Sequence, residues 1–372
     1  MDENVFDAVV LGGGIMGSAV ALRLAEGGMR VALFEQRALG AGASGVNAGT
    51  LSLQTKRAAL MPYALAGQEL WRRAGERVGY RETGGLTLAF TPDEATYLEE
   101  RVEERRQAGA PIELIQPSRA RELEPHVSEH IEAASYCALD GYANASLTGL
   151  YYRQLLSDAG VRVREGQRVE AIERASQRFR VRAGGEVAVG TRLVLAGGAW
   201  LKEAGALLGI SLPIIVRANI VSVTERMPPL LRGVVLQTYG RLTLKQKPNG
   251  TFLIGGAWQG EGDPSEGAGR VTTDALIGNL RLAVYALPPL ADSRLIRSWV
   301  GYEARAPDVF PLVGEIPGFS NAYVIGAVLG GYTIGPYIGR LLGDAMLGEE
   351  PERALFPPDR FDDLNSIPAA TN

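Results

Sequence analysis

The chain opens with the alternation of elements that builds a parallel sheet. An apolar run at 5–11 precedes a glycine-rich turn, and residues 18–26 then carry apolar side chains at helical spacing. Gly27 and Gly28 end that helix, and a second apolar run follows at 31–34. Two continuously apolar strands flanking a helix predict a βαβ unit whose strands are buried on both faces.

The middle of the chain has a different pattern. Residues 179–189 and 214–256 alternate between apolar and polar positions and are rich in β-branched side chains, with a Pro-Asn-Gly turn at 248–250. This pattern predicts antiparallel strands. Continuously apolar strands return at 191–196 and 322–325, far along the chain from the first βαβ unit.

The simplest fold that accommodates both patterns has a domain inserted into another domain. We expect the α/β class, with a discontinuous Rossmann-like dinucleotide-binding domain built from residues 1–80, 145–212 and 296–372. The inserted part, residues 81–144 and 213–295, is expected to form an α+β substrate domain on an antiparallel sheet.

Composition narrows the classes of function. Apolar residues make up 46% and charged residues 22% of the 372 residues, and the net charge of −4 gives no positive field to attract nucleic acid. The single cysteine, Cys137, excludes an internal disulfide and a cysteine-rich metal site, and we expect no metal. The acidic start of the chain is unlike a signal peptide, and no apolar run reaches the roughly 18–20 residues of a transmembrane helix. We therefore expect a cytoplasmic protein.

A dinucleotide fingerprint follows the first strand. Gly12, Gly14 and Gly17 form G-x-G-x-x-G at the start of the predicted helix. In this motif the glycines allow a tight turn, a close approach of backbone to a pyrophosphate and close helix–strand packing, while the helix N-terminus attracts the phosphates. Glu35 ends the second strand, where a carboxylate can accept hydrogen bonds from ribose hydroxyls.

A small, polar and glycine-dense segment follows at 39–50. Such a segment can run beside a long cofactor, with Ser44 and Asn47 donating to its oxygens. The alternative is an ordinary surface loop.

Several motifs together resemble the D-amino-acid oxidase superfamily of FAD-dependent oxidoreductases. They are G-G-G-I-M-G at 12–17, G-A-S-G-V-N-A-G at 42–49, D-G-Y-A-N at 140–144, L-A-G-G-A-W at 195–200, and the glycine-framed segments 301–314 and 326–339. That superfamily includes glycine and sarcosine oxidases and the FAD subunits of opine, proline and cyanide-forming amino-acid dehydrogenases. The motifs run through most of the chain in the family's order.

The resemblance implies non-covalently bound FAD and a set of contacts along the chain. Carried over residue by residue, the expected cofactor-binding set is Gly12, Gly14, Ile15, Met16, Gly17, Glu35, Gln36, Arg37, Ser44, Asn47, Ala48, Gly49, Leu51, Val169, Ala196, Gly197, Trp200, Gly301, Gly330, Gly331, Tyr332, Thr333 and Ile334.

Physical chemistry supports the C-terminal part of this set. Gly330 and Gly331 let backbone approach a flat ring, and Pro336 is expected at or near the start of a helix over 337–347. A helix N-terminus directed at the flavin's pyrimidine edge would stabilise the negative charge of the reduced ring. The alternative is a glycine turn before a helix that packs in the core.

The chain departs from glycine-oxidase-like members where they bind the substrate carboxylate. Their G-L-R-P motif reads Gly301-Tyr302-Glu303-Ala304 here, so Glu303 stands where they have an arginine. Arg305 would point to the same face of an extended segment and could replace that arginine, or Glu303 could contact a cationic amine. A salt bridge of Arg305 with Glu303 or Asp308 is an equally good interpretation.

Tyr239, Trp258 and Tyr332 are candidates for an aromatic wall of the substrate pocket, although each could belong to the core. The candidate catalytic set is thus Arg305, Glu303, Tyr332 and Tyr239.

The expected reaction is the oxidation of a small amine or amino acid. The substrate C–H gives a hydride to flavin N5, and water hydrolyses the resulting imine. The electron acceptor would be oxygen, or a quinone or redox partner subunit in a hetero- or homo-oligomer. Two alternatives stay open: a nicotinamide-dependent dehydrogenase, and a non-catalytic flavin-binding subunit.

Overall fold

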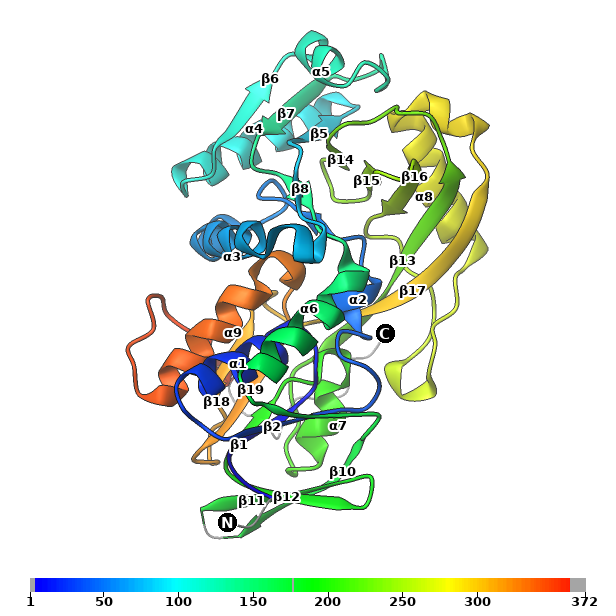
Figure 1. Cartoon of the computed structure of the whole chain (residues 1–372). Coiled ribbons are helices and arrows are strands. Elements are labelled where there is room, and N and C mark those ends of the chain that lie inside the picture. Colours follow the sequence, from blue (N-terminus) through cyan, green and yellow to red (C-terminus); the bar gives the residue numbers. More distant parts are fainter. Residues whose placement is uncertain (1–3, 176, 362–372) are drawn as a thin grey trace. The chain divides into compact units, whose positions relative to one another are not determined.

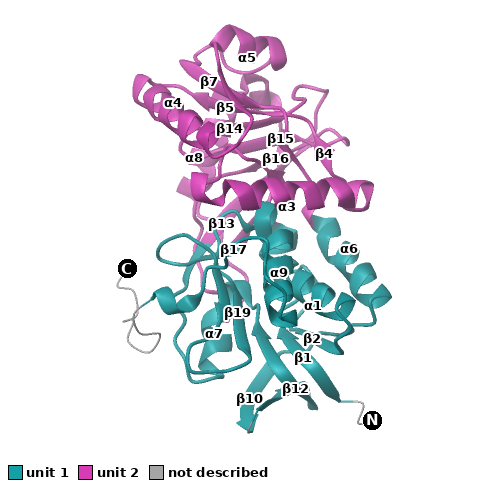
Figure 2. Ribbon diagram, turned by 90° about the vertical axis from the view of Figure 1, so that its left-hand side faces the viewer, with its two compact units in different colours: residues 1–46, 146–217, 302–372 teal, residues 47–145, 218–301 magenta. Residues whose placement is uncertain are grey.

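The computed structural model describes residues 4–175 and 177–361, which divide into two compact units. The first unit comprises residues 1–46, 146–217 and 302–372, and the second comprises 47–145 and 218–301 (Figure 2). We expected residues 47–80 in the first unit. They group with the second because its residues hold them, as described below.

The first unit is built on a mixed sheet whose central strands are parallel (Figure 1). Its strand order is β10-β11-β12-β1-β2-β9, and β19 pairs with both β12 and β18. The strands are β1 (Val5–Leu11), β2 (Val31–Glu35), β9 (Arg162–Glu165), β10 (Val169–Ala175), β11 (Arg178–Ala183), β12 (Glu186–Leu195), β18 (Leu312–Glu315) and β19 (Ala322–Gly326). The helices are α1 (Ile15–Glu26), α2 (Ala43–Val46), α6 (Ala145–Asp158), α7 (Leu201–Ala206) and α9 (Gly331–Leu347), with 3₁₀ turns at Gly198–Trp200 and Pro358–Arg360.

The predicted βαβ unit is confirmed, because β1 and β2 pair in parallel on either side of α1. The two segments expected at 179–189 and 191–196 meet in one strand, β12. Its first half, residues 186–190, pairs antiparallel with β11, and residues 189–195 pair in parallel with β1. The core of this unit lies against the sheet and includes Phe34, Leu195 and Val324, all almost fully buried.

Helix α9 lies parallel to α1 along a row of glycines. The row occupies every fourth position and consists of Gly331, Gly335, Gly339 and Gly343. A methyl group on Gly335 would meet Ile15 and Met16 at the N-terminus of α1, whereas one on Gly343 would meet Arg23 near its other end. The two helix N-termini therefore lie at the same end of the pair (Figure 1).

The expected start of the last helix was wrong. Helix α9 begins at Gly331, so Pro336 lies inside it rather than at its first position. The missing N–H of Pro336 removes one helical hydrogen bond. The close packing of α9 against α1 can offset the loss of this hydrogen bond.

The second unit is built on a largely antiparallel sheet, as predicted for residues 214–256. Its order is β17-β13-β16-β15-β14-β5-β7-β6, and a small sheet has the order β3-β8-β4. The strands are β3 (Thr50–Leu51), β4 (Arg81–Glu82), β5 (Gly85–Ala89), β6 (Ile112–Ile115), β7 (Ala133–Cys137), β8 (Gly141–Tyr142), β13 (Ile215–Arg226), β14 (Val234–Gln237), β15 (Thr243–Gln246), β16 (Thr251–Gly255) and β17 (Leu295–Arg305). The helices are α3 (Met61–Ala74), α4 (Pro92–Gln107), α5 (Pro117–Leu123) and α8 (Thr273–Ala286), with 3₁₀ turns at Ala58–Leu60, Gly75–Val78, Pro264–Glu266 and Pro288–Asp292.

This unit has its own core, in which Leu244, Phe252 and Ile254 of the sheet pack with Ala283 of α8. One pair of strands, β14 and β5, is parallel.

Candidate functional site

The glycine turn after β1 has room for backbone only. Gly12 has a φ of +111°, and a methyl group there would overlap the carbonyl oxygen of Ala196. A methyl group on Gly17 would overlap the carbonyl oxygen of Gly12. The turn therefore passes directly beside the end of β12, where Ala196 and Gly197 lie, and brings the backbone of α1's first turn to this edge of the sheet.

The N-terminus of α1 is arranged as an anion site. Its N-cap residue, Gly14, has no side chain that could cap the helix, and the Ile15 N–H donates to the Ser44 hydroxyl at 2.9 Å. The first-turn amides of a helix carry a partial positive charge and lack helical partners. Ser44, on α2, thus lies where a pyrophosphate would bind. Ile15 itself is buried, and Met16 is half-buried toward α9.

Glu35 leans toward this turn from the end of β2. Its carboxylate accepts hydrogen bonds from the Gly13 N–H and the Arg37 N–H, both at 2.8 Å. Gln36 is half-buried beside it, and the exposed Arg37 places its guanidinium 5.1 Å from the ring of Trp200. Residues predicted from three separate motifs are therefore neighbours. Val169, at the start of β10, packs on the edge of the core.

The segment 47–51 belongs to the second unit, and its backbone is closely packed. The Asn47 side-chain oxygen accepts the Gly49 N–H at 2.6 Å, which closes a local turn. Gly49 has a φ of +74°, and a methyl group there would overlap the carbonyl oxygen of Ala143. The side chains of Ala48 and Leu51 are buried, so backbone atoms are what this segment can offer a ligand.

A buried carboxylate anchors the residues that follow. Asp140, fully buried, accepts hydrogen bonds from the Ser52 hydroxyl at 2.5 Å, the Leu53 N–H at 2.8 Å and the Gln54 side chain at 3.0 Å. Burial raises the pKa of Asp140 above its usual range, against these hydrogen bonds. The D-G motif thus ties the predicted cofactor segment to the second unit, a role that the motif alone did not reveal.

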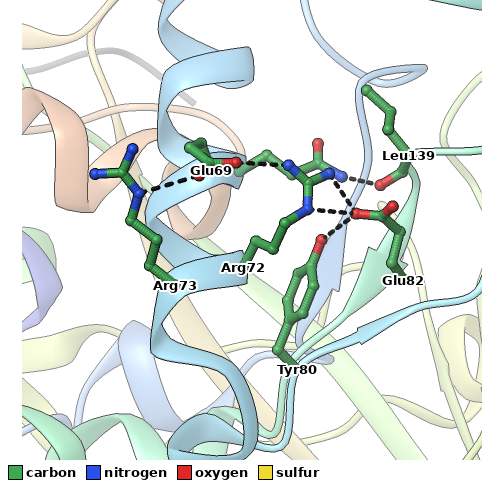
Figure 3. Close-up of polar contacts among 7 residues, drawn as sticks. Glu69, Arg72, Arg73, Tyr80, Glu82 and Leu139 are labelled. Atoms are coloured by element: carbon green, nitrogen blue, oxygen red, sulfur yellow. Dashed lines mark hydrogen bonds and ion pairs between the residues drawn. The ribbon is translucent and has the colours of Figure 1, made fainter.

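A charged cluster on α3 holds the neighbouring strand β4. Arg72 pairs with Glu69 and with Glu82, whose carboxylate also accepts the Tyr80 hydroxyl at 2.8 Å (Figure 3). The Gln68 side chain donates to the carbonyl of Leu139, the residue before Asp140. We therefore interpret this charged cluster as structural: it holds β4 against α3, and its contacts do not resemble those of a catalytic group.

A glycine turn also precedes helix α9. Gly330 is left-handed, with φ of 67° and ψ of 31°, and its N–H donates to the Glu303 carboxylate at 3.0 Å. The Thr333 hydroxyl, in the first turn, is fully buried and has no hydrogen-bond partner among the described residues. An unsatisfied buried hydroxyl requires an explanation, and a bound ligand that supplies the missing partner is one.

The neighbours of Thr333 are more enclosed. Tyr332 makes a hydrogen bond of 3.0 Å with the Thr148 hydroxyl, and burial raises the pKa of Tyr332 above its usual range. Ile334 is fully buried, while Gly331 packs against Met16 and Val328. Tyr332 is therefore a neutral phenol, and its contact with Thr148 does not mark it as a catalytic group.

Glu303 and Arg305 lie on one face of β17, as predicted, while Ala304 points into the core. The salt bridge left open for Arg305 is not formed in the described part of the chain: Asp308 pairs with Arg360 at 2.8 Å instead. The Arg305 Nε is buried without a hydrogen-bond partner among the described residues.

The backbone beside Arg305 is strained. Ala327 has a φ of +53°, uncommon for a residue with a side chain, and its carbonyl accepts the Ala306 N–H at 3.0 Å. Such strain gathers at functional sites. Gly301, also on β17, is half-buried and ends the second unit's share of this strand.

Tyr239 and Trp258 come together in the second unit. Both line an open pocket of about 620 Å³ that also exposes Arg241, Arg281 and Tyr285. Tyr332 belongs to the first unit.

Comparison with known proteins decides the family. The sequence model of the DAO family, FAD-dependent oxidoreductases, matches residues 7–345. The chain belongs to this family. It is 29% identical to glycine oxidase of Geobacillus kaustophilus over 366 residues, covering 95% of this chain and 96% of that protein. It is 24% identical to one of the subunits of opine oxidase from Rhizobium meliloti, over 96% of this chain and 98% of that relative.

Solved structures agree with this assignment. The crystal structure of the Geobacillus kaustophilus glycine oxidase superposes with a TM-score of 0.86 and 26% identity, over 96% of this chain and 99% of that chain. L-amino acid deaminase from Proteus myxofaciens shares the fold, with a TM-score of 0.85 and 18% identity over 97% of this chain and 94% of that chain. The predicted fold class and the predicted cofactor, FAD, are thereby confirmed, and the nicotinamide-dependent alternative is wrong.

The residues present fit this cofactor. Two parallel helices offer their N-termini at one end, glycine backbone lies before each of them, and the Thr333 hydroxyl lacks a partner within the described chain. No helix of residues 4–175 and 177–361 is long and apolar enough to cross a membrane. The same residues contain no cluster of His, Cys, Asp or Glu that could hold a metal ion.

Proposed function

We propose that the protein oxidises the carbon–nitrogen single bond of a small amino acid. FAD, when bound, takes up the hydride from the substrate carbon, which leaves an imine for water to hydrolyse. The observation that carries the choice of an amino acid over a simple amine is the pair Glu303 and Arg305. The Glu303 carboxylate already accepts the Gly330 N–H, whereas the Arg305 Nε is buried and has no partner among the described residues.

The protein's share of the work is binding and orientation. The first turn of α1 and Ser44 would hold the pyrophosphate, and Glu35 would accept hydrogen bonds from the ribose. The Glu303 carboxylate accepts the Gly330 N–H and so fixes this turn. The N-terminus of α9 and the Thr333 hydroxyl, which has no partner among the described residues, would then face the pyrimidine edge. The positive end of α9 would stabilise the charge that reduction places on the ring.

Arg305 would bind the substrate carboxylate. A guanidinium can form two parallel hydrogen bonds with a carboxylate, which orients the substrate as well as binding it. Folding has already removed water from the buried Nε of Arg305. A carboxylate that supplies its missing hydrogen bond therefore contributes more binding free energy than it would at a solvated arginine.

The names of the relatives suggest which substrates to test. Similar proteins include glycine oxidases, an L-proline dehydrogenase from P. horikoshii and an iminodiacetate oxidase from Chelativorans sp. BNC1. Others are subunits, as in opine oxidase and hydrogen cyanide synthase. The acceptor is thus oxygen, or a quinone or partner subunit in an oligomer, and cytoplasmic location stays part of the proposal.

The test is anaerobic bleaching of the FAD-loaded protein by matched substrate pairs. Glycine is compared with methylamine, and proline with pyrrolidine, because each pair differs only in the carboxylate. We expect the amino acid of at least one pair to bleach the flavin and its amine to fail. Bleaching by the amines alone would contradict the role of Arg305, and bleaching by no amine or amino acid would favour a non-catalytic flavin subunit. Oxygen uptake against dye reduction then identifies the acceptor.

Arg305→Leu is the companion variant, with Arg297→Leu as its control on the exposed part of the same strand. Loss of one partner of a buried charged pair costs roughly 2–5 kcal/mol, so KM for the amino acid should rise at least tenfold. The flavin spectrum should not change. An Arg305 variant with the KM of the control would show that the carboxylate binds elsewhere.

A further inference from the structure

One lysine lies where its strand pattern predicts solvent. Lys245 is on β15, where Leu244 packs in the core of the second unit, so alternation directs Thr243 and Lys245 to the other face. Yet Lys245 is fully buried. Segment 48–50, far away in the sequence, covers it.

Lys245 holds this segment directly. Its ammonium group donates to the carbonyl oxygen of Ala48 at 2.8 Å and to the Thr50 hydroxyl oxygen at 2.6 Å. The Thr50 hydroxyl also contacts the Thr243 hydroxyl at 2.7 Å. Thr243 and Lys245, which share the face of β15 opposite Leu244, therefore hold by hydrogen bonds the segment that the family resemblance places along FAD.

The ammonium group has no counter-ion in the described part of the protein. No carboxylate of the described residues forms an ion pair with Lys245. Burial lowers the pKa of Lys245 to about 7, and the nearby positive charge of Lys247 contributes to this lowering. A buried cation without an anionic partner is costly, and a group whose pKa is strongly shifted in this way is a candidate for a functional role.

An anionic cofactor would remove this cost. FAD brings a pyrophosphate, and its ring becomes negative on reduction.

We propose that Lys245 is a positioning residue that fixes segment 48–50 against FAD and places a buried positive charge that favours the reduced cofactor. This rests on the proposed function, in which FAD is bound, and on the family resemblance, which assigns the segment to the cofactor. Because Lys245 has no exposed surface, it acts through Ala48 and Thr50 and not by contact with the substrate.

Two variants separate the charge from the hydrogen bonds. Lys245→Met removes both, whereas Lys245→Gln removes the charge and keeps an N–H donor on a side chain that is one bond shorter. Lys247→Met is the control: Lys247 lies two residues further on the same face, with its ammonium group 5.3 Å from the ring of Tyr142, and is not bonded to segment 48–50. The measurements are the Kd for FAD and the midpoint potential of bound FAD, set by equilibration with redox dyes.

We expect Lys245→Met to raise the Kd for FAD at least tenfold and Lys245→Gln to raise it less. Both should lower the preference for reduced FAD about tenfold, which for a two-electron couple is a potential more negative by about 30 mV. Lys247→Met should change neither quantity by as much. If Lys245→Met does not fold, the potential of Lys245→Gln decides.

Potentials equal to that of the wild type in both variants would overturn the proposal, even with a weaker Kd, because a purely structural brace would leave the potential unchanged. The dye measurement needs no substrate. A wild-type protein that binds FAD but is reduced by no amino acid would therefore contradict the proposed function and leave this test in force.

Discussion

Replacing Gly339 with alanine tests the helix pair that carries both N-termini. A methyl group at Gly339 would lie 2.5 Å from the Cβ of Ala19 and 2.9 Å from the carbonyl oxygen of Met16. Carbon atoms in contact are normally about 3.5–4.0 Å apart, so α1 and α9 must separate by about 1 Å. Overpacking of this kind costs about 1–3 kcal/mol, while alanine gains about 0.5–1 kcal/mol over glycine inside a helix.

We therefore expect Gly339→Ala to lower the free energy of unfolding by about 1–2 kcal/mol. The substitution should also weaken FAD binding, since the first turns of both helices move apart. Urea unfolding of the FAD-free protein measures the first effect, and titration with FAD measures the second.

A compensating change gives the control. Ala19→Gly removes the carbon atom nearest to the new methyl group, so the double variant should be more stable than the sum of the two single changes by about 1 kcal/mol. Strictly additive effects, or a Gly339→Ala protein as stable as the wild type, would refute the close parallel packing of α1 and α9.

Two further outcomes are expected. Glu35→Ala should weaken FAD binding by roughly 1.5–3 kcal/mol, or about 10- to 150-fold in Kd, through lost charge-assisted hydrogen bonds. The control is Glu165→Ala, at the paired position of β9. Equal Kd values for the two variants would mean that Glu35 does not reach the ribose. Burial lowers the pKa of Lys245 to about 7 from 10.5, so between these pH values the unfolded chain binds the extra proton and stability rises with pH. Relative to Lys245→Met, the FAD-free wild type should gain on the order of 1 kcal/mol per pH unit from pH 7 to pH 9 in urea unfolding; parallel pH profiles for the two proteins would contradict this.

The local elements near the N-terminus could be predicted from the sequence because their causes are local. The glycine turn, the buried strands on either side of α1 and the acid at the end of β2 follow from spacing and residue type within about thirty residues. The glycine turn and the acid to which we assign the pyrophosphate and the ribose could therefore be predicted from the sequence. Glycine at every fourth position of α9 was also visible, but its meaning depends on the partner helix.

The tertiary structure decided the matters that depend on distant residues. The boundary of the two units moved to Asn47 because Asp140 and Lys245 hold the segment after it. Strand alternation alone would leave Lys245 exposed, since alternation describes one sheet face and not what later covers it.

The substrate end shows the same division. The sequence itself determined that Glu303 replaces the family's arginine and that Arg305 shares its face of the strand. Only the tertiary structure gave Glu303 a partner in the Gly330 N–H and directed Asp308 to Arg360, leaving the Arg305 Nε without one among the described residues. Residue type and spacing specify which groups are available, whereas long-range packing specifies which of them are already satisfied.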